Sequence, residues 1–332
     1  MSVTTGVLPL AAKTHGKAGD VDRAAFLLST LDRRWQDSRP LRLIVVAPSA
    51  DAGAIGKVLQ STPRVQVDLR TEEEFFDRDE AFQALPGWWK QQVIKLVVPA
   101  VLRLGPYLTF DADVACVRDF DGRTFVREGR LVSQWYRQYR NGWWAATARL
   151  LARPYEGSAL GLDVTPNVLH SDLAACVIWR LAWLGIGIDA PGARNFPAAR
   201  LLSRLALLGL GIAPPGVGVA PRFVRRAATR RLHRWYEEAQ ARARSGEVVH
   251  EDTWTEYSLY TLLSGKGLQH RHAPPSDDMP LLAHPWCIWY PAERERLGLF
   301  TTEARPVAPF VVLQSTSGAS LAEVKAAVGR LP

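Results

Sequence analysis

The first 110 residues alternate between short apolar runs and amphipathic stretches, and this alternation restricts the fold more than any other feature of the chain. A short apolar run bounded by turn residues is typical of a buried strand, whereas apolar residues three and four apart are typical of a helix. The predicted strands cover residues 6–12, 41–47, 65–69 and 107–110, and the predicted helices cover 20–35, 52–60, 75–84 and 88–104. Strands that alternate with helices imply an α/β fold, a mostly parallel sheet with helices on both faces.

The rest of the chain is predicted to be mainly helical and to complete the same domain. Helices are expected at 143–151, 171–184, 223–244, 253–264 and 319–331, and extended segments at 131–137, 164–170, 286–290 and 310–314. Glycine and proline are frequent between 185 and 221, which predicts a loop-rich insertion. We therefore expect one enlarged domain made of two halves, 1–130 and 131–332, with a basic helical insertion at about 185–244.

The bulk composition favours a globular protein with an anionic ligand or surface as partner. The chain has 332 residues, is 47% hydrophobic and 22% charged, and carries a net charge of +8. Its three cysteines are far apart and lack metal-site spacing, which predicts reduced thiols rather than a disulfide or a zinc site. The first twelve residues do not resemble a signal peptide, and no long uncharged apolar run occurs. We expect a cytoplasmic protein, soluble or held at the inner face of the membrane.

Tryptophan is frequent in this chain. Twelve are present, and several occur in pairs such as Trp88-Trp89 and Trp143-Trp144. Such pairs suit an aromatic-lined cleft and equally suit ordinary core packing. The sequence leaves both interpretations open.

Two carboxylates follow the fourth predicted strand, in the triplet Asp111-Ala112-Asp113. Ligands of open α/β sheets bind at the carboxyl ends of the strands, where these side chains would lie. Carboxylate oxygens there can hold a hard divalent cation, and the cation can hold a diphosphate. The alternative is an exposed pair of turn or helix-capping aspartates, because about one D-x-D triplet is expected by chance in a chain of this length.

Several segments occur in an order that is more specific than any one of them. The helix 88–104 opens with Gly87-Trp88-Trp89-Lys90-Gln91-Gln92-Val93-Ile94-Lys95-Leu96, and the aspartate triplet follows it. Next come Val164-Thr165-Pro166-Asn167-Val168, Thr255-Glu256-Tyr257-Ser258-Leu259-Tyr260 and Phe310-Val311-Val312-Leu313-Gln314-Ser315. From about residue 6 to the C-terminus, this order resembles a bacterial family of glycosyltransferase-like proteins with a GT-A-like fold. The chain departs from that family at 185–244, which is longer and more basic.

The resemblance implies a metal-dependent glycosyltransferase that moves a sugar from a nucleotide-diphosphate donor to a saccharide or lipid-linked acceptor. It further implies a UDP-sugar as donor and a role in cell-envelope or surface polysaccharide synthesis. A nucleoside diphosphate leaves with growing negative charge, which a divalent metal stabilises without proton transfer. The implied fold is GT-A-like, with a helical C-terminal region on the acceptor side.

The donor site is expected to combine the aspartate triplet with residues of the preceding segments. By resemblance, Asp113 is a metal ligand and Asp111 binds metal or ribose, with Mn²⁺ or Mg²⁺ as the cation. Lys95 can reach the donor phosphates or a sugar hydroxyl, or can be a solvated helix lysine. Lys13 and Asp51 follow the first two strands, where the base is expected. Asp51 can accept from a uracil N–H or can N-cap the next helix.

Histidines provide a further candidate metal ligand. His284 can be a third ligand by resemblance, although a lone histidine is more often structural. His270 and His272 could also bind metal, but they lie in a segment with arginine and proline, which favours solvent exposure.

The acceptor hydroxyl is expected to need a carboxylate as base. Glu256 is the first candidate, because Glu251 and Asp252 precede it and a like-charge cluster can raise a pKa toward neutrality. Asp172 is the second candidate. Each of the two can instead be an ordinary residue of the first helical turn.

The basic stretch 222–234 has two interpretations, a contact with anionic lipid head groups at the membrane surface or a solvated helix. Two further functions stay open. One is a haloacid-dehalogenase-like phosphatase with Asp111 as nucleophile, and the other is a non-enzymatic basic binding protein. Nucleic acid is not an expected partner, because basic and aromatic residues are not interleaved on strands and no DNA-reading module is present.

Overall fold

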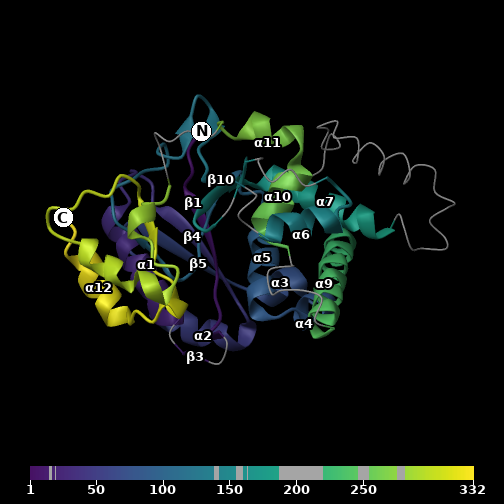
Figure 1. Cartoon of the computed structure of the whole chain (residues 1–332), viewed down its shortest axis with the longest axis horizontal. Helices are drawn as coiled ribbons and strands as arrows, with labels where there is room; N and C mark the ends of the chain where they lie inside the picture. Colours follow the sequence, from purple (N-terminus) through teal and green to yellow (C-terminus); the bar gives the residue numbers. More distant parts are fainter. Residues whose placement is uncertain are drawn as a thin grey trace.

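The computed structural model describes residues 1–14, 17–18, 20–137, 142–154, 160–162, 164–186, 220–245, 254–274 and 281–332. A five-stranded sheet in the order β12-β6-β1-β4-β5 forms its centre (Figure 1). The strands are β1 (Thr5–Pro9), β4 (Leu41–Ala47), β5 (Val65–Thr71), β6 (Pro106–Thr109) and β12 (Asn167–His170). The first four are parallel, and β12 pairs antiparallel with β6. The predicted α/β fold with a mostly parallel sheet is confirmed.

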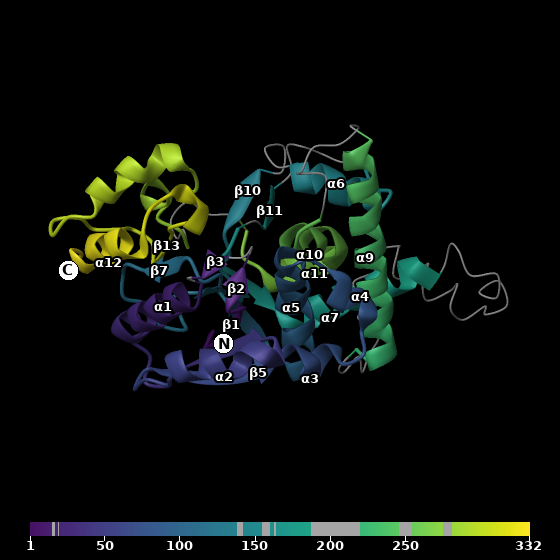
Figure 2. The same cartoon turned by 90° about the horizontal axis from the view of Figure 1, so that it is seen from below.

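Helices cover both faces of this sheet because each strand buries its two faces in different cores. Leu8 and Val45 pack in one cluster with the helices α1 (Asp20–Arg34) and α2 (Ser49–Val58). Their neighbours Val7 and Ile44 pack in a second cluster with α5 (Gly87–Leu102). Figure 2 shows α1 and α5 on opposite sides of β1.

The strand order reverses between β1 and β6. The chain builds outward from β1 to β4 and β5 and then returns to add β6 on the other side of β1. In open α/β sheets the crevice at the carboxyl ends of two such strands is the usual ligand site. The Asp111 triplet follows β6 and therefore lies at this crevice.

A glycine fixes the position at which the chain leaves β6. A Cβ on Gly6 would lie 2.6 Å from the Phe110 ring, so only glycine allows the ring to pack against β1. The Phe110 N–H also donates to the Val7 carbonyl at 2.9 Å. These contacts hold the residue that directly precedes Asp111.

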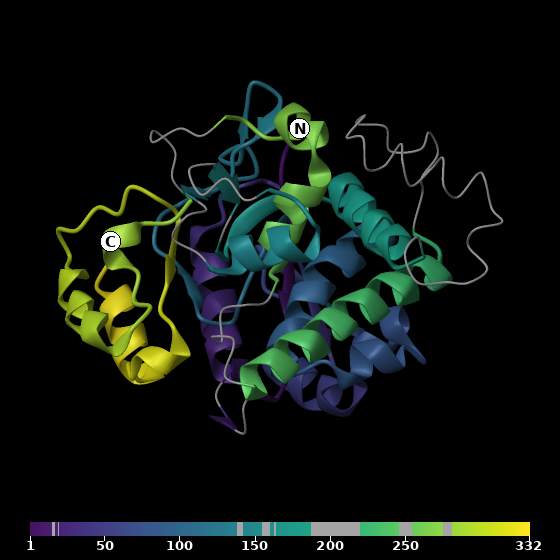
Figure 3. The ribbon, with the colours of Figure 1, turned by 45° about the vertical axis from the view of Figure 1, so that its right-hand side comes forward.

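The second half of the chain adds a helical layer and then returns to the first core. The helical layer consists of α6 (Gly142–Leu150), α7 (Ser171–Ile186), α9 (Arg222–Arg244), α10 (Glu256–Ser264) and α11 (Lys266–Arg271). The C-terminal segment instead packs with α1, where β13 (Phe310–Val312) pairs antiparallel with β7 (Val114–Cys116) and α12 (Leu321–Gly329) closes the chain. Figure 3 shows this yellow C-terminal segment at the left of the molecule, apart from the green α9.

Three predicted elements differ from the structure. The predicted helix 75–84 is two helices, α3 (Glu72–Phe76) and α4 (Glu80–Ala84), because Asp79 caps α4 and starts a new helix. The predicted strand 131–137 is interrupted between β9 (Arg130–Leu131) and β10 (Trp135–Arg137). The strand predicted at 286–290 is wrong. Pro285 starts a 3₁₀ turn there, and only Ile288 forms a single bridge, to Leu313.

The basic helix α9 is packed against the protein rather than solvated on all sides. Val224, Ala228, Leu232 and Trp235 are buried and follow one face at helical spacing. Most of the loop-rich segment predicted before it, residues 187–219, lies outside the described residues. No described helix is long and apolar enough to span a bilayer.

His272 is buried in a complete hydrogen-bond chain, so its predicted solvent exposure is wrong. Ser133 donates through Oγ to the Val168 carbonyl, and the same oxygen lies 2.8 Å from His272 Nδ1, from which it accepts. The Tyr260 hydroxyl accepts from the His170 N–H and lies 3.0 Å from His272 Nε2, to which it donates. This pattern requires a neutral ring, and burial lowers the pKa of His272 to about 3.

The buried neutral histidine predicts an acid-sensitive stability. The unfolded chain protonates His272 near its ordinary pKa of 6.5, but the folded protein does not. Stability is therefore present above that pH and is lost as the pH falls, by about 1.4 kcal/mol per pH unit. In urea unfolding at pH 6.5, 5.5 and 4.5, His272→Gln should show a shallower loss than the wild type. His270→Gln, at an exposed position, should keep the wild-type slope, and equal slopes for all three proteins would contradict the prediction.

Candidate active site

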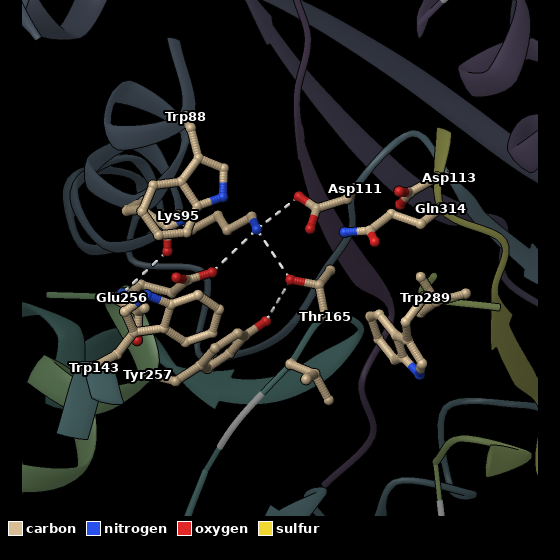
Figure 4. A pocket seen from close by; sticks show the side chains of 14 residues that line it. Trp88, Lys95, Asp111, Asp113, Trp143, Thr165, Glu256, Tyr257, Trp289 and Gln314 are labelled. Carbon is tan, nitrogen blue, oxygen red and sulfur yellow. Dashed lines mark hydrogen bonds and ion pairs between the residues drawn. The ribbon is translucent and has the colours of Figure 1, made fainter. Parts of the chain in front are cut away.

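A pocket opens at the carboxyl end of β6, at the reversal of strand order (Figure 4). Its polar lining comes from segments that are far apart in the sequence. These groups are Lys95 on α5, Asp111 and Asp113 between β6 and β7, Thr165 before β12, Glu256 and Tyr257 in the first turn of α10, and Gln314 after β13.

Lys95 is the central residue of the pocket. Its Nζ lies 2.7 Å from Asp111 Oδ1 and 3.0 Å from Glu256 Oε1, and only 1% of the side chain is exposed. Burial lowers the pKa of Lys95, but the two carboxylates more than offset burial and raise the pKa above its ordinary value. Lys95 is therefore a permanent cation in this pocket, and the solvated-lysine alternative is wrong.

A chain of hydroxyl groups runs from Lys95 into the sheet. Lys95 Nζ donates to Thr165 Oγ1 at 3.0 Å, and the Tyr257 hydroxyl lies 2.8 Å from the same oxygen. Tyr257 is also 2.7 Å from Thr109 Oγ1, which donates to the Asn167 carbonyl. Each hydroxyl thus accepts from the previous group and donates to the next. Burial raises the pKa of Tyr257, which keeps this hydroxyl protonated.

Glu256 occupies the first turn of α10, and its backbone is fixed from two sides. Thr255 caps the helix by accepting from the Ser258 N–H, and the Glu256 N–H donates to Gln92 Oε1 at 3.2 Å. Burial raises the pKa of Glu256 to about 7, against the opposing effect of Lys95. The predicted raised pKa is therefore present, but its main cause is burial rather than the preceding acidic residues. Glu251 and Asp252 lie outside the described residues.

The two aspartates of the triplet have different surroundings. Asp111 points to Lys95, whereas the Asp113 side chain lies toward Gln314 (Figure 4). Burial and the Asp111 carboxylate raise the pKa of Asp113 to about 7, although Arg23 opposes this shift. The Leu313 N–H donates to the Asp113 carbonyl at 2.9 Å, and this bond places Gln314 beside the aspartate.

The oxygen donors of the triplet fit a small divalent cation. The lining contains three carboxylates and one lysine, so when ionised it carries an excess of negative charge. Mg²⁺ is commonly held by one or two carboxylates together with phosphate oxygens of a substrate. Within the described ranges, no group of three or more His, Cys, Asp or Glu side chains is placed to hold a metal ion. Asp111 and Asp113 therefore suit a cation that a phosphate ligand shares.

Tryptophans form the walls of the pocket. Trp88 and Trp143 stand together with ring centroids 5.8 Å apart, and Trp289 lies on the other side, near Gln314 (Figure 4). The pocket therefore has one end with Glu256 and two indoles, and another with Asp113, Gln314 and the third indole.

A second pocket lies where β1 and β4 end, the place at which the sequence predicts the base. Its lining includes Pro9, Pro48, Glu72 and Lys90. Lys90 Nζ lies 3.5 Å from Glu72 Oε2, and burial raises the pKa of Glu72.

Of the two residues predicted to bind the base, Asp51 is described in full and does not line this pocket. Asp51 accepts from the Ala12 N–H at 2.8 Å through Oδ2, which ties the end of β1 to α2. It is not an N-cap, because α2 begins at Ser49. Lys13 has its backbone in β2 (Lys13–Thr14), and its side chain lies outside the described part of the structure.

Asp172 and His284 are not brought into the pocket. Because β12 is antiparallel to β6, its carboxyl end lies at the amino end of β6, away from the pocket. Asp172 follows β12 there, is 61% exposed and pairs with Arg271. His284 contacts the Tyr136 hydroxyl and does not line the pocket. Burial lowers the pKa of His284, as does Arg296, so the ring is a neutral partner of the tyrosine.

The sequence did not point to several residues that the structure places in the pocket. Thr165, Tyr257 and Gln314 belong to the ordered segments, but the residue types alone gave them no role. Trp143 and Trp289 join the pocket only through tertiary packing. Their signal in the sequence was the frequency of tryptophan, which core packing explains equally well.

The chain belongs to a protein family that a family model over almost its whole length identifies. Residues 1–331 match the model of the "Family of unknown function (DUF6492)". No curated protein matches the chain. Among solved structures, the apo crystal structure of mouse xyloside xylosyltransferase 1 is similar at 12% identity and a TM-score of 0.46, covering 95% of this chain and 99% of that one. At this TM-score the likeness supports no argument about the function of the chain.

The buried charges predict a strong and pH-dependent effect of removing Lys95. Lys95→Met leaves Glu256 buried without its cation, which should lower the free energy of unfolding by about 3–5 kcal/mol. The pKa of Glu256 then rises further above its unfolded value. Stability from its protonation is present at low pH and lost as the pH rises, so the defect should be larger at pH 8 than at pH 6.

Urea unfolding at both pH values measures this effect. The double variant Lys95→Met/Glu256→Gln should recover part of the loss, since the unpaired carboxylate is gone. Lys57→Met, at an exposed position of α2, should stay close to the wild type. If Lys95→Met is as stable as the wild type at pH 8, the assignment of Lys95 as the compensating cation is wrong.

Proposed function

We propose that this protein is a metal-dependent glycosyltransferase of the GT-A type, which transfers a sugar from a nucleotide-diphosphate donor. The observation that carries the proposal is the buried ammonium of Lys95, which joins Asp111 to Glu256 at the reversal of strand order. A cation-binding carboxylate pair and a carboxylate of raised pKa thereby share one pocket.

The donor would lie along the rim of the sheet. Asp111 and Asp113 would hold Mn²⁺ or Mg²⁺, and the ion, when bound, neutralises the diphosphate and stabilises it as a leaving group. The second pocket, at the ends of β1 and β4, would receive the nucleoside. Uridine as the base and envelope polysaccharide as the pathway are carried over from the sequence resemblance. The arginines of α9 would offer the membrane contact if the acceptor is lipid-linked.

Glu256 is the proposed base for the acceptor. In the transfer, the bond between the anomeric carbon and the phosphate oxygen breaks, and its electron pair stays on the phosphate. The acceptor oxygen forms the new bond to the anomeric carbon and gives its proton to the Glu256 carboxylate. A base with a pKa near the working pH suits this role, and the pKa of Glu256 is about 7. Lys95 holds this carboxylate in place through Oε1.

The donor proposal predicts a ligand-dependent melting temperature. UDP with Mn²⁺ at about 100 times its Kd should stabilise the folded protein by about 2.7 kcal/mol, which raises Tm by a few degrees. Asp113→Asn should abolish this rise, because it removes a cation ligand. Asp172→Asn, at the opposite edge of the sheet, should keep it. A thermal-shift panel of nucleoside diphosphates with and without metal measures the effect.

Two results would support one of the other two functions instead of a glycosyltransferase. Release of phosphate from a simple phosphate ester, lost in Asp111→Asn, would support the phosphatase alternative. Salt-sensitive binding of a polyanion without any response to nucleotide would support the basic binding protein.

The base assignment predicts a separation of binding from turnover. Glu256→Gln should retain the thermal shift with UDP and Mn²⁺ but lower the transfer rate by about 10²–10⁴-fold, since only the proton acceptor is lost. Radiolabelled sugar transfer, or UDP release in the presence of acceptor, measures the rate. Glu80→Gln is the control, an exposed glutamate in the first turn of α4 that lines neither pocket, and should retain turnover. An unchanged rate in Glu256→Gln would exclude this residue as the base.

A further inference from the structure

In each of the two tryptophan pairs of the sequence, one tryptophan packs inside the protein and the other lines the pocket. Trp144 is buried in the protein, whereas Trp143 is partly exposed and lines the pocket. Trp89 packs against Tyr236 with ring centroids 4.8 Å apart, whereas its neighbour Trp88 lines the pocket. One indole of each pair therefore lines this pocket, and these two, Trp88 and Trp143, are both partly exposed.

Both exposed indoles lie at the Glu256 end of the pocket. Trp88 lies in the first turn of α5 and Trp143 in the first turn of α6, and their rings meet at an interplanar angle of 37° beside the Glu256 carboxylate (Figure 4). Asp113 and Gln314 lie at the other end, and Asp111 lies between the two ends, against Lys95 (Figure 4). A molecule that covers these indoles would thus be placed at the proposed base and away from the diphosphate.

The chemistry of this end selects a particular kind of molecule. The indole faces are apolar, and covering them removes apolar surface from water. The Glu256 carboxylate lies beside them and bonds Lys95 through Oε1, and an acyl chain laid against this carboxylate would offer it no hydrogen bond, which is costly. A pyranose ring satisfies both demands, because it has an apolar C–H face and hydroxyls at its edge. The excess of carboxylates disfavours an anionic ring.

We infer that Trp88 and Trp143 form a subsite for a neutral saccharide acceptor, which stacks on the indoles and directs a hydroxyl to Glu256. This inference rests on the proposed function and narrows its acceptor from a saccharide or a lipid to a sugar ring. A lipid-linked acceptor would enter the subsite with its sugar and not with its chain.

Saturation-transfer NMR tests the subsite without turnover. The probes are methyl β-D-glucopyranoside, methyl β-D-galactopyranoside, methyl α-D-mannopyranoside, cellobiose and lactose. At least one should bind the wild type, with the strongest transfer on ring C–H protons. Trp143→Ala should weaken its binding by about tenfold, and Trp143→Phe, which keeps an aromatic face and guards against misfolding, by less. Trp286→Ala is the matched control, because Trp286 packs on Phe300 outside the pocket.

Failure of the subsite and failure of the donor proposal give different results. Each variant is also tested for the thermal shift with UDP and Mn²⁺, which Trp143→Ala should retain. If no probe binds the wild type, or if Trp143→Ala and Trp88→Ala bind as the wild type does, the subsite is wrong even when the thermal shift is present. If probes bind in a Trp143-dependent manner and no nucleotide gives a shift, the subsite stands and the donor proposal fails.

Discussion

The buried ammonium of Lys95 is the interaction on which the arrangement of the pocket depends. A charge with 1% exposure is tolerated only where opposite charges and hydrogen-bond acceptors surround it. Its partners Asp111, Thr165 and Glu256 come from the turn after β6, the segment before β12 and the start of α10. None of these segments can move far without leaving the lysine uncompensated. The requirement to compensate one cation therefore fixes three parts of the chain around one pocket.

Why the pocket forms where it does follows from the topology of the sheet. The chain builds β4 and β5 on one side of β1 and adds β6 on the other, so the segments that follow β1 and β6 diverge and leave a crevice at the carboxyl ends of these strands. Phe110 packs against Gly6 and thereby fixes the chain at that crevice, directly after β6. The C-terminal segment closes it from the other side, because the Leu313 N–H binds the Asp113 carbonyl. Residues separated by about 200 positions thus line one wall.

The local sequence predicts the strands, the helices and the carboxylate triplet, because these depend on neighbours a few residues away. It does not predict long-range pairing. The acidic residues before Glu256 predict a raised pKa for this residue. The pKa is raised, but its largest cause is burial, which the neighbouring residues in the sequence do not show. Asp172 was placed wrongly because residue types do not show that β12 runs antiparallel. The arginine and proline around His272 predict solvent exposure, and the sequence does not reveal its burial because its partner Ser133 lies 139 residues earlier.

Stability alone does not account for charged groups in this position. Replacing a buried ion pair by apolar residues of similar volume is often neutral or stabilising, whereas removing one partner is costly. An apolar core at the positions of Lys95 and Glu256 would therefore serve the fold at least as well. The tryptophans support the same conclusion, because two partly exposed indoles stand above these charges instead of covering a hydrophobic core. Charges at positions where apolar residues would also serve the fold, beside two partly exposed indoles, are best explained by the binding and chemistry of a ligand.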